Sequence, residues 1–370
     1  MRFNKQNYMH LESLQILNFK NYSAIDFEFN PKINCFVGKN AVGKTNVLDA
    51  IYYLSFTKSF VSSLDSYNVK TNESLFLIQG NYLRKEKVEH IHCGYKKGQK
   101  KQIKRNKKDY KKYSEHIGQF PLVMISPLDS EIITGGSELR RKLIDGVISQ
   151  YDKSYLEALL KYNSALKQRN SLLKQFAKSN NFQEDALEVW DFQLENVGTI
   201  IYEKRKAFIE EYIPYFQKFY DILTNDKQTV GIHYYSQLQD DNLSNLLKNQ
   251  RAKDRMVQHT TVGVHKDDLL FSLNDLPIKR LGSQGQQKTL LLALKLAQYQ
   301  HIYKYSKVKP ILLLDDIFDK LDRERVKSLI QIITQEDFGQ TFITDTNEER
   351  LLDIFSIDKI HVKIFNLNPS

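Results

Sequence analysis

Hydrophobic residues near the start of the chain follow the two-residue period of strands. The apolar positions that alternate with polar ones are Leu14, Ile16, Ile25, Phe27 and Phe29. This alternation predicts a hairpin of half-buried strands. A short apolar run over 33–37 predicts a buried strand, and the apolar spacing over 46–56 predicts a helix after it. Further two-residue periods over 74–125 predict more strands.

From about residue 136 to residue 256 the pattern changes to helical spacing. Apolar residues recur at steps of three and four along a stripe made of Leu187, Trp190, Leu194, Val197 and Ile201. The stripe predicts an amphipathic helix that ends near Pro214, with Trp190 as a core residue rather than a ligand contact. We therefore expect an arm of several antiparallel helices in this part of the chain.

Strand-like alternation returns after residue 261. The elements predicted there are helices over 284–303 and 323–333 and strands from Ile311 and over 341–344. The helical block is thus inserted into an α/β lobe that both ends of the chain build. We predict a head at 1–135 plus 257–370 and a helical arm at 136–256.

The chain is basic: its 370 residues carry a formal net charge of +10, with a pI of about 9.2. This excess of positive charge favours a polyanionic partner, and nucleic acid is the first candidate and an anionic membrane the second. A dense run of cations lies between Lys96 and Lys112, where only Asp109 opposes them. This basic run either contacts the phosphate backbone of DNA or is a solvated hairpin edge whose lysines prevent strand pairing. Arg140 with Arg141 is a second candidate for DNA contact.

Other features of composition narrow the class of protein. Cys35 and Cys93 form no C-x-x-C pair, so we expect no disulfide framework and no zinc site, and a reducing cytoplasm fits. No run reaches the roughly 18 apolar residues of a membrane span, so no membrane partner is expected. The polar start lacks a signal-peptide core, and Met9 is a candidate start alongside Met1.

One segment fits the G-x-x-x-x-G-K-[ST] pattern of phosphate-binding loops, between the predicted strand and the predicted helix. The residues expected to bind the nucleotide are Gly38, Lys39, Asn40, Ala41, Val42, Gly43, Lys44 and Thr45. The two glycines allow the backbone to approach the phosphates at the helix N-terminus. We expect Lys44 to act on the β- and γ-phosphates of ATP during catalysis and the Thr45 hydroxyl to ligate Mg²⁺.

Asp315 and Asp316 end an aliphatic run that is typical of a central parallel strand. Two adjacent carboxylates are unfavourable there unless a metal or water offsets them. We predict that Asp315 is a ligand of Mg²⁺ and that Asp316 is the catalytic acid that orients the attacking water. The alternative, a helix N-cap, leaves the second acid unexplained.

Ser283, Gln284, Gly285 and Gln286 open a predicted helix. Ser283 alone fits an ordinary N-cap, but the N–H groups and positive field of a helix N-terminus also suit the γ-phosphate of ATP. Because the phosphate loop already holds the nucleotide within its own chain, a second anion-binding helix end is useful when another copy supplies it. We therefore predict an ATP-dependent, head-to-tail homodimer with two ATP molecules between its subunits.

The order of phosphate loop, long insertion, glycine-glutamine signature and acidic strand end is the order found in ABC-type ATPases. Within them the chain resembles the RecF family of bacterial recombinational repair proteins, from about Met9 almost to the C-terminus. The segments that carry the resemblance beyond the phosphate loop are 125–127, 140–145, 162–170, 265–268, 282–287 and 313–322. The signature at 282–287 and the helix with Arg169-Asn170 are the most specific of these.

The resemblance implies an ABC-type ATPase head with an inserted helical arm. It also implies a cytoplasmic, ATP-dependent DNA-binding protein of DNA repair and replication, active in the SOS response to DNA damage. Such proteins bind duplex DNA and its junctions with single strands, dimerise on ATP, and act with RecR- and RecO-type partners to help load recombinase at gaps. Aspartate at 316, where most ABC ATPases have glutamate, implies slow hydrolysis that serves as a switch.

Three segments depart from the family pattern, and the mildest departure has Val264 and Lys266 in place of proline and arginine around His265. Leu128 stands where the family often has an acid, and Asp129 follows it, so the resemblance assigns Asp129 no contact with metal or water. Ser59-Phe60-Val61 replaces a serine-histidine-arginine, so no phosphate or partner contact is carried over to that place.

Other interpretations stay open. Another SMC-like or ABC head ATPase would have hundreds of coiled-coil residues or an acidic nuclease domain, and the ATP-hydrolysing subunit of a transporter usually has a shorter insertion. A DNA-binding module with little turnover has the same sequence features as a switch ATPase. The sequence therefore leaves the hydrolysis rate and the face that binds DNA undetermined.

Overall fold

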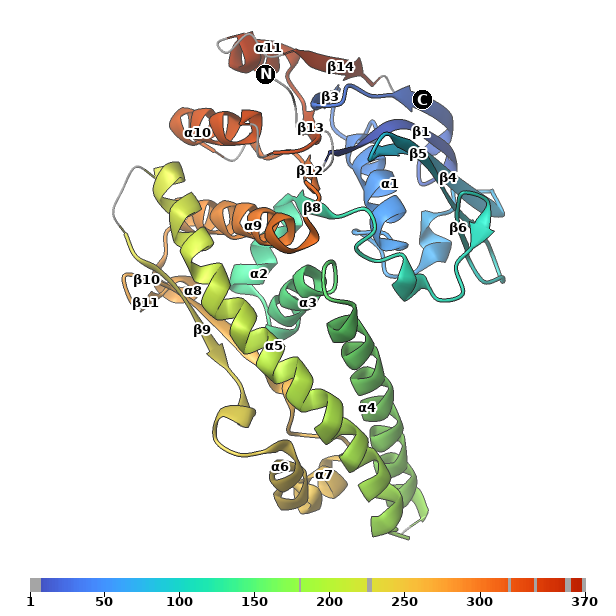
Figure 1. The fold of residues 1–370 in the computed structure, drawn as a ribbon, viewed down its shortest axis with the longest axis vertical. Helices are drawn as coiled ribbons and strands as arrows, with labels where there is room; N and C mark the ends of the chain where they lie inside the picture. The colour runs from blue at the N-terminus through green and yellow to red at the C-terminus, as the bar shows by residue number, and fades with distance from the viewer. Residues whose placement is uncertain are drawn as a thin grey trace. The chain divides into compact units, whose positions relative to one another are not determined.

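The computed structural model describes residues 8–179, 181–224, 228–318, 321–335, 338–356 and 361–367. The chain folds into two compact units (Figure 1). The first unit consists of Met1–Asp129, Phe219–Asp226 and Lys288–Ser370, and the second of Ser130–Lys218 and Lys227–Gln287. The division at 1–135 plus 257–370 and 136–256 stays a prediction from the sequence; the compact units place 257–287 with the helical block.

The first unit contains an antiparallel sheet with the strand order β2-β1-β4-β5-β6-β7. Its strands are β1 (Met9–Phe19), β2 (Tyr22–Glu28), β4 (Leu75–Arg84), β5 (Lys87–Lys96), β6 (Gln102–Arg105) and β7 (Lys108–Asp109). The predicted hairpin is confirmed, because Leu14 pairs with Phe27 and Ile16 with Ile25 across β1 and β2.

The second sheet of this unit is parallel, with the order β14-β3-β13-β12-β8. Its strands are β3 (Ile33–Val37), β8 (Leu122–Ile125), β12 (Ile311–Leu314), β13 (Thr341–Asp345) and β14 (Val362–Asn366). All residues of β3, β8, β12 and β13 are buried, as expected for a parallel sheet covered on both faces. The carboxyl ends of these strands therefore meet at one edge of the sheet, where open α/β sheets bind their ligands.

Helix α1 (Lys44–Phe56) contacts strands of both sheets (Figure 1). Its buried residues Val47, Leu48 and Ile51 belong to the same hydrophobic core as Phe36 of β3 and Ile78 of β4. Burial of each such side chain contributes roughly 1.5–3 kcal/mol to the stability of the fold. The other α-helical segments of the first unit among the described residues are α10 (Arg323–Thr334), α11 (Glu348–Ser356), most of α9 (Gln284–Ser306) and the end of α5 from Phe219.

The second unit is mainly helical and contains one small sheet, ordered β11-β10-β9. Its strands are β9 (Val230–Tyr235), β10 (Asp268–Leu273) and β11 (Leu276–Pro277). Its helices are α2 (Glu131–Thr134), α3 (Ser137–Ile148), α4 (Lys153–Ser179), α5 (Glu184–Thr224, up to Lys218), α6 (Leu243–Asn249), α7 (Arg251–Val257) and α8 (Ile278–Leu281). No described helix combines the length and the apolar character needed to cross a membrane.

Two expectations about the helical block were wrong. The block is interrupted by β9, which pairs with β10 along its whole length. The short alternation at Val230 and Ile232 forms a strand because its partner strand comes from a distant part of the chain. The long helix does not end near Pro214: α5 continues through the proline to Thr224. Tyr212 and Phe216 on either side of Pro214 are buried, and their packing offsets the backbone hydrogen bond that proline cannot make.

Buried arginines connect the elements of the second unit. Arg169 of α4 is fully buried and donates to Asp191 of α5 at 2.6 Å, to Asp254 of α7 at 2.6 Å and to the Thr260 hydroxyl at 2.9 Å. The family-specific arginine of the sequence is thus the centre of an ion network that joins three helices.

Arg205 of α5 forms a second such centre. It pairs with Asp145 of α3 at 2.8 Å and with Asp267 at 2.7 Å. Arg140 is buried and donates to Asp268, and Arg141 donates to the backbone oxygen of Asp267. Arg140, proposed from the sequence as a DNA contact together with Arg141, therefore has its charge directed into the unit.

Candidate functional site

The phosphate loop joins the carboxyl end of β3 to the first turn of α1, as the sequence predicts. Gly43 is the N-cap of α1 with a φ of 105°, in the left-handed region that favours glycine. A Cβ atom on Gly43 would lie 2.6 Å from the Asn21 side chain, and one on Gly38 would lie 2.6 Å from the backbone oxygen of Leu367. Both glycines are therefore required by the backbone geometry of the loop.

Lys44 lies folded over this loop. Its side chain is 4% exposed, and its Nζ donates to the backbone oxygens of Gly38 at 2.8 Å and Lys39 at 3.1 Å. A cation at a helix N-terminus is unfavourable by itself, because the helix dipole places positive charge there. The backbone oxygens of Gly38 and Lys39 hold the ammonium group at the loop, where a bound phosphate would offset its charge.

Asp315 follows β12 and connects the loop to the parallel sheet. The Thr45 hydroxyl lies 2.9 Å and 3.0 Å from its two carboxylate oxygens, and Thr344 of β13 donates to Oδ1 at 2.8 Å. Burial raises the pKa of the Asp315 carboxyl; the two hydroxyl hydrogen bonds oppose this rise, and the neighbouring Asp316 adds to it. The surroundings of Asp315 thus disfavour its negative charge. A bound cation would offset this unfavourable charge, as is typical of a functional carboxylate.

Asp316 has an unusual backbone and an incompletely bonded carboxylate. Its φ is 45°, a left-handed value that is uncommon for a residue other than glycine. Among the residues that the structure describes, no hydrogen-bond donor contacts its buried Oδ1 atom. Strained backbone and unpaired buried oxygen atoms gather at functional sites, because the cost of about 1–3 kcal/mol persists only when the surroundings enforce it.

These residues fit Mg²⁺ held together with a nucleotide. No group of three or more histidine, cysteine or acidic residues that could hold a metal ion by itself occurs in the described part of the chain. Mg²⁺ in phosphate-transferring enzymes is usually bound by one or two protein oxygens, with phosphates and waters completing its octahedron. The Thr45 hydroxyl and the Asp315 carboxylate offer that donor set next to the phosphate loop.

The turn of the predicted hairpin between β1 and β2 packs against the phosphate loop, a contact that the sequence did not predict. Asn46 donates to the Asn21 side-chain oxygen at 2.7 Å, and Asn21 donates to the backbone oxygen of Val42 at 3.2 Å. The Tyr22 hydroxyl donates to the backbone oxygen of Gly43 at 3.3 Å. Asn21 and Tyr22 stand in no recognisable motif, and the two-residue period that predicts the hairpin does not show which segment its turn contacts.

Asp129, whose role the sequence left open, is engaged by the protein itself. Its carboxylate lies 2.7 Å from Nζ of Lys295 on α9 and accepts a hydrogen bond from the Ser126 backbone N–H at 2.8 Å. Lys295 also donates to the backbone oxygen of Met124 at 3.0 Å. With both side chains buried, this pair fastens the middle of α9 to the segment after β8.

Ser59, at another departure from the family pattern, is likewise used internally. Its hydroxyl donates to Asp49 of α1 at 2.6 Å, and the Phe60 N–H donates to the same carboxylate at 2.6 Å. Lys20 completes this arrangement with an ion pair to Asp49 at 2.5 Å.

The predicted signature opens α9 and belongs to the second unit. The Ser283 hydroxyl accepts a hydrogen bond from the Gln286 N–H at 3.2 Å, and the Gln286 side chain accepts one from the Ser283 N–H at 2.9 Å. This reciprocal pair is a capping box. Ser283 and Gln284 are exposed. The Ser283 hydroxyl keeps its own proton available to an external acceptor, because it only accepts in the capping box.

The basic run begins at the last residue of β5, includes β6 and β7, and is not uniform. Lys101 is turned inward, donating to the backbone oxygen of Thr57 and pairing with Asp65, and Arg105 pairs with Glu89. The lysines of the run that are exposed are Lys96, Lys97, Lys100, Lys107, Lys108, Lys111 and Lys112. Its outer lysines therefore form the part that can contact a partner.

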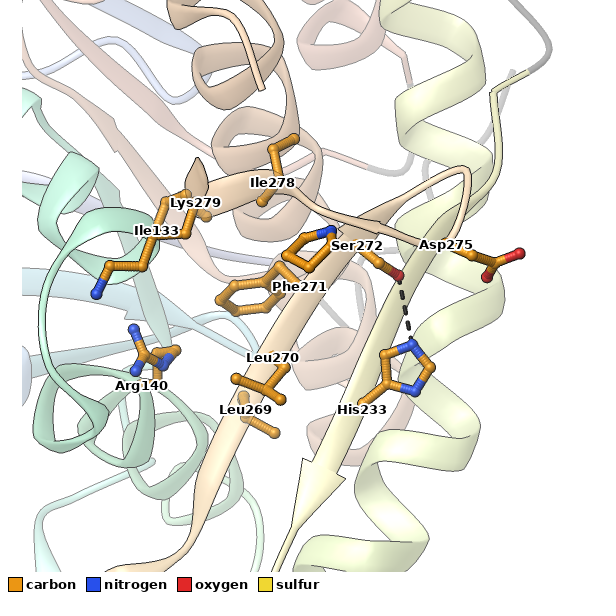
Figure 2. Close-up of a pocket in the computed structure, with 11 residues that line it drawn as sticks. Ile133, Arg140, His233, Leu269, Leu270, Phe271, Ser272, Asp275, Ile278 and Lys279 are labelled. Carbon is orange, nitrogen blue, oxygen red and sulfur yellow. Dashed lines mark hydrogen bonds between the residues drawn. The ribbon is translucent and has the colours of Figure 1, made fainter. Parts of the chain in front are cut away.

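A pocket of about 340 Å³ lies in the second unit; Arg140 lines it, but none of the predicted nucleotide-binding, metal-binding or catalytic residues does. Figure 2 shows Leu269, Leu270 and Phe271 of β10 along its wall, with the Ser272 hydroxyl directed at the His233 ring, 3.4 Å from Nε2. Its apolar wall has no convergent set of reactive groups, in contrast to the loop edge of the parallel sheet.

Comparison with protein families and curated proteins finds matches along almost the whole chain. The family described as "RecF/RecN/SMC N terminal domain" matches residues 10–363. The DNA replication and repair protein RecF of Flavobacterium johnsoniae is 49% identical over 359 residues, which are 97% of this chain and 100% of that protein. The RecF protein of Phocaeicola vulgatus is 48% identical over 96% of both chains.

Solved structures give the same pattern. The structure of the recombination mediator protein RecF with ATP in the RecFOR pathway has a TM-score of 0.87 and 33% identity, covering 94% of this chain and 95% of that chain. The Smc head domain of Pyrococcus furiosus has a TM-score of 0.56 at 17% identity, covering 98% and 94% of the two chains. The second likeness supports the fold alone: an ABC-type ATPase head with an inserted helical arm.

Proposed function

The chain belongs to the RecF family, and on that premise we propose that it is an ATP-binding DNA repair and replication protein whose phosphate loop holds ATP with Mg²⁺. The observation that carries the proposal is the contact of the Thr45 hydroxyl with the Asp315 carboxylate. It joins the phosphate loop to the acidic end of β12, which the sequence separates by 270 positions.

Each residue of the site has a distinct part in this proposal. The loop N–H groups and Lys44 bind the β- and γ-phosphates, and Thr45 with Asp315 holds Mg²⁺, which neutralises charge on the phosphates. Asp316 orients a water molecule for attack and accepts its proton, since its Oδ1 atom has no hydrogen-bond partner among the described residues. Slow hydrolysis then acts as a switch between two states of the protein.

A second copy of the chain completes the site in this proposal. Ser283, Gln284, Gly285 and Gln286 of one subunit cap the γ-phosphate bound by the other, and the exposed Ser283 hydroxyl supports that role. ATP then closes a head-to-tail homodimer with two nucleotides between its subunits.

We propose DNA as the partner of the closed dimer, in duplex form and at its junctions with single strands, with RecR- and RecO-type proteins as further partners. The exposed lysines of the basic run are the first candidate surface for DNA, because clustered lysines release counterions from the phosphate backbone. Arg140 and Arg141 are less suitable, since both side chains already donate within the second unit.

Sedimentation of the chain with and without MgATP tests the proposal. The parental protein is expected to double in mass with MgATP, whereas Lys44→Ala should remain a monomer and lose nucleotide binding. Lys327→Ala removes an exposed lysine of α10 in the same unit and should behave as the parental protein. An unchanged mass of the parental protein at saturating MgATP would contradict the ATP-dependent dimer.

The DNA surface is tested by the salt dependence of binding. Replacing Lys107, Lys108, Lys111 and Lys112 by glutamine should reduce the slope of log K against log salt by about 3 to 4, if each contacts one phosphate. The control replaces Arg323 and Lys327, exposed cations of α10, and should keep the parental slope. A parental slope in the fourfold variant would remove this part of the basic run from the interface.

A further inference from the structure

Thr344 of β13 contacts both acids of the candidate site. It is fully buried, and its hydroxyl accepts a hydrogen bond from the Asp316 backbone N–H at 2.8 Å. The same hydroxyl donates its single proton to Oδ1 of Asp315 at 2.8 Å. One side chain therefore uses its acceptor on one aspartate and its donor on the other.

The two acids need such support, because they lie beyond the end of β12. The strand ends at Leu314, which pairs with Ile343 of β13, and Asp315 keeps one further backbone hydrogen bond to Ile125 of β8. Asp316 has turned into the left-handed region, where the regular ladder of the sheet no longer fixes its backbone. Its N–H is held by the Thr344 hydroxyl instead.

Thr344, by contrast, is fixed within the sheet. It pairs with Phe36 of β3, one residue before the pair between Asp345 and Val37, at the point where β3 enters the phosphate loop. Thr344, which pairs with the strand that leads into the phosphate loop, thus binds both Asp315 and Asp316 after the end of β12. The distance between the nucleotide-binding half and the acidic half of the site depends on this connection.

Resting on the proposed function, we infer that Thr344 is a positioning residue for ATP hydrolysis. Its hydroxyl keeps Asp316 in the backbone conformation that directs the carboxylate to the attacking water. It also occupies Oδ1 of Asp315, so that the other carboxylate oxygen and the Thr45 hydroxyl are the atoms that would hold Mg²⁺. Thr344 touches neither nucleotide nor water in this role, and it acts through the two aspartates.

Thr344→Val and Thr344→Ser separate positioning from packing. Valine has nearly the shape of threonine but lacks the hydroxyl, so the single-turnover rate of ATP hydrolysis should fall on the order of 10-fold to 100-fold. The dissociation constant for ATP without Mg²⁺ should stay within about twofold of the parental value, because the phosphate loop is untouched. Serine restores the hydroxyl, and its rate should lie within about threefold of the parental rate.

Thr341→Val is the matched control on the same strand. Thr341 is fully buried, and its hydroxyl has no hydrogen-bond partner among the described residues. This variant should keep the parental rate and affinity. If Thr344→Val does not fold, the same comparison is made between Thr344→Ala and Thr344→Ser.

A parental rate in the valine variant, or a serine variant as slow as valine, would overturn the inference while leaving the proposed function intact. A parental protein that binds no ATP would remove both. A rate that falls with valine, returns with serine and is unchanged in Thr341→Val supports the positioning role.

Discussion

The charges around Arg169 in the second unit and around Asp315 in the first unit are arranged differently. In the second unit, the guanidinium of Arg169 lies between the carboxylates of Asp191 and Asp254. In the first unit, Asp315 and Asp316 are neighbours of like charge, and hydroxyl groups rather than a cation of the chain contact Asp315. Buried charges that form ion pairs within the chain stabilise the fold, whereas two neighbouring acids that form no ion pair among the described residues retain the capacity to bind a cation.

The largest expected effect comes from breaking the arginine network. Arg169→Met leaves the buried carboxylate of Asp254 without its counter-charge and should lower the free energy of unfolding of the second unit by about 3–5 kcal/mol. Trp190, the single tryptophan of the chain, lies on α5 in this unit, so its fluorescence in a urea titration reports the transition.

Lys142→Met is the control for that experiment. Lys142 pairs with Glu138 on the surface of α3, where both side chains are largely exposed, and such pairs contribute less than about 1 kcal/mol. Equal destabilisation by the two substitutions would contradict the view that the Arg169 network supports the fold.

The second effect concerns the acid pair. Asp316→Asn should reduce ATP hydrolysis on the order of 10²-fold or more, because asparagine cannot accept the proton of the attacking water. The same change removes the repulsion between the buried carboxylate of Asp315 and the half-buried carboxylate of Asp316, so the free energy of unfolding should not decrease. Nucleotide binding should persist, and the dimer with MgATP should accumulate.

Phosphate release measures the loss of hydrolysis in Asp316→Asn, and thermal unfolding of the same preparation measures whether its stability is kept. Glu324→Gln, on the exposed first turn of α10, is the control and should match the parental protein in both assays. Loss of stability together with loss of hydrolysis would place Asp316 among the residues that hold the fold.

The smallest effect is the dependence of stability on pH that His265 should produce. Burial lowers the pKa of His265 to about 4, while its Nε2–H donates to the backbone oxygen of Thr260 and its Nδ1 accepts from the Tyr162 hydroxyl. The unfolded chain binds a proton at the ordinary pKa of about 6.5. Between these two values the unfolded state binds more protons, so stability is complete above about pH 6.5 and falls as the pH is lowered toward 4.

The free energy of unfolding is measured at pH 7 and at pH 4.5. In His265→Gln the difference between these two values should be smaller than in the parental protein by on the order of 2 kcal/mol. His259→Gln changes an exposed histidine of the same unit and should leave the decline as it is. A decline of equal size in both variants would assign the pH dependence to other groups.

Local pattern was sufficient to predict the elements around the site. The apolar run before Gly38 and the helical spacing after it gave β3 and α1 with nearly the observed bounds, and the run that ends at Asp315 gave β12. These predictions succeeded because a buried parallel strand and the helix that follows a phosphate loop are each determined by their own residues.

Contacts between distant segments could not be predicted in this way. Thr344 looks like any threonine in a strand, and its role depends on the register of β13 against β3 and β12. Asn21 lies in a turn whose partner is the phosphate loop, and β9 needs β10 to become a strand. The prediction that the helix ends near Pro214 was wrong because it considered only the effect of proline on its own helix. The packing of Tyr212 and Phe216 against other segments keeps the helix intact.

The buried pair of Lys295 and Asp129 has a consequence for how such a protein can diverge. Replacing one of the two residues leaves the charge of the other buried without a partner. Each single substitution therefore gives a destabilised protein. A paired change to two apolar residues of similar volume avoids such a destabilised protein and is often neutral for stability. We therefore expect these two positions to be inherited as a unit, with natural variants carrying both charges or neither.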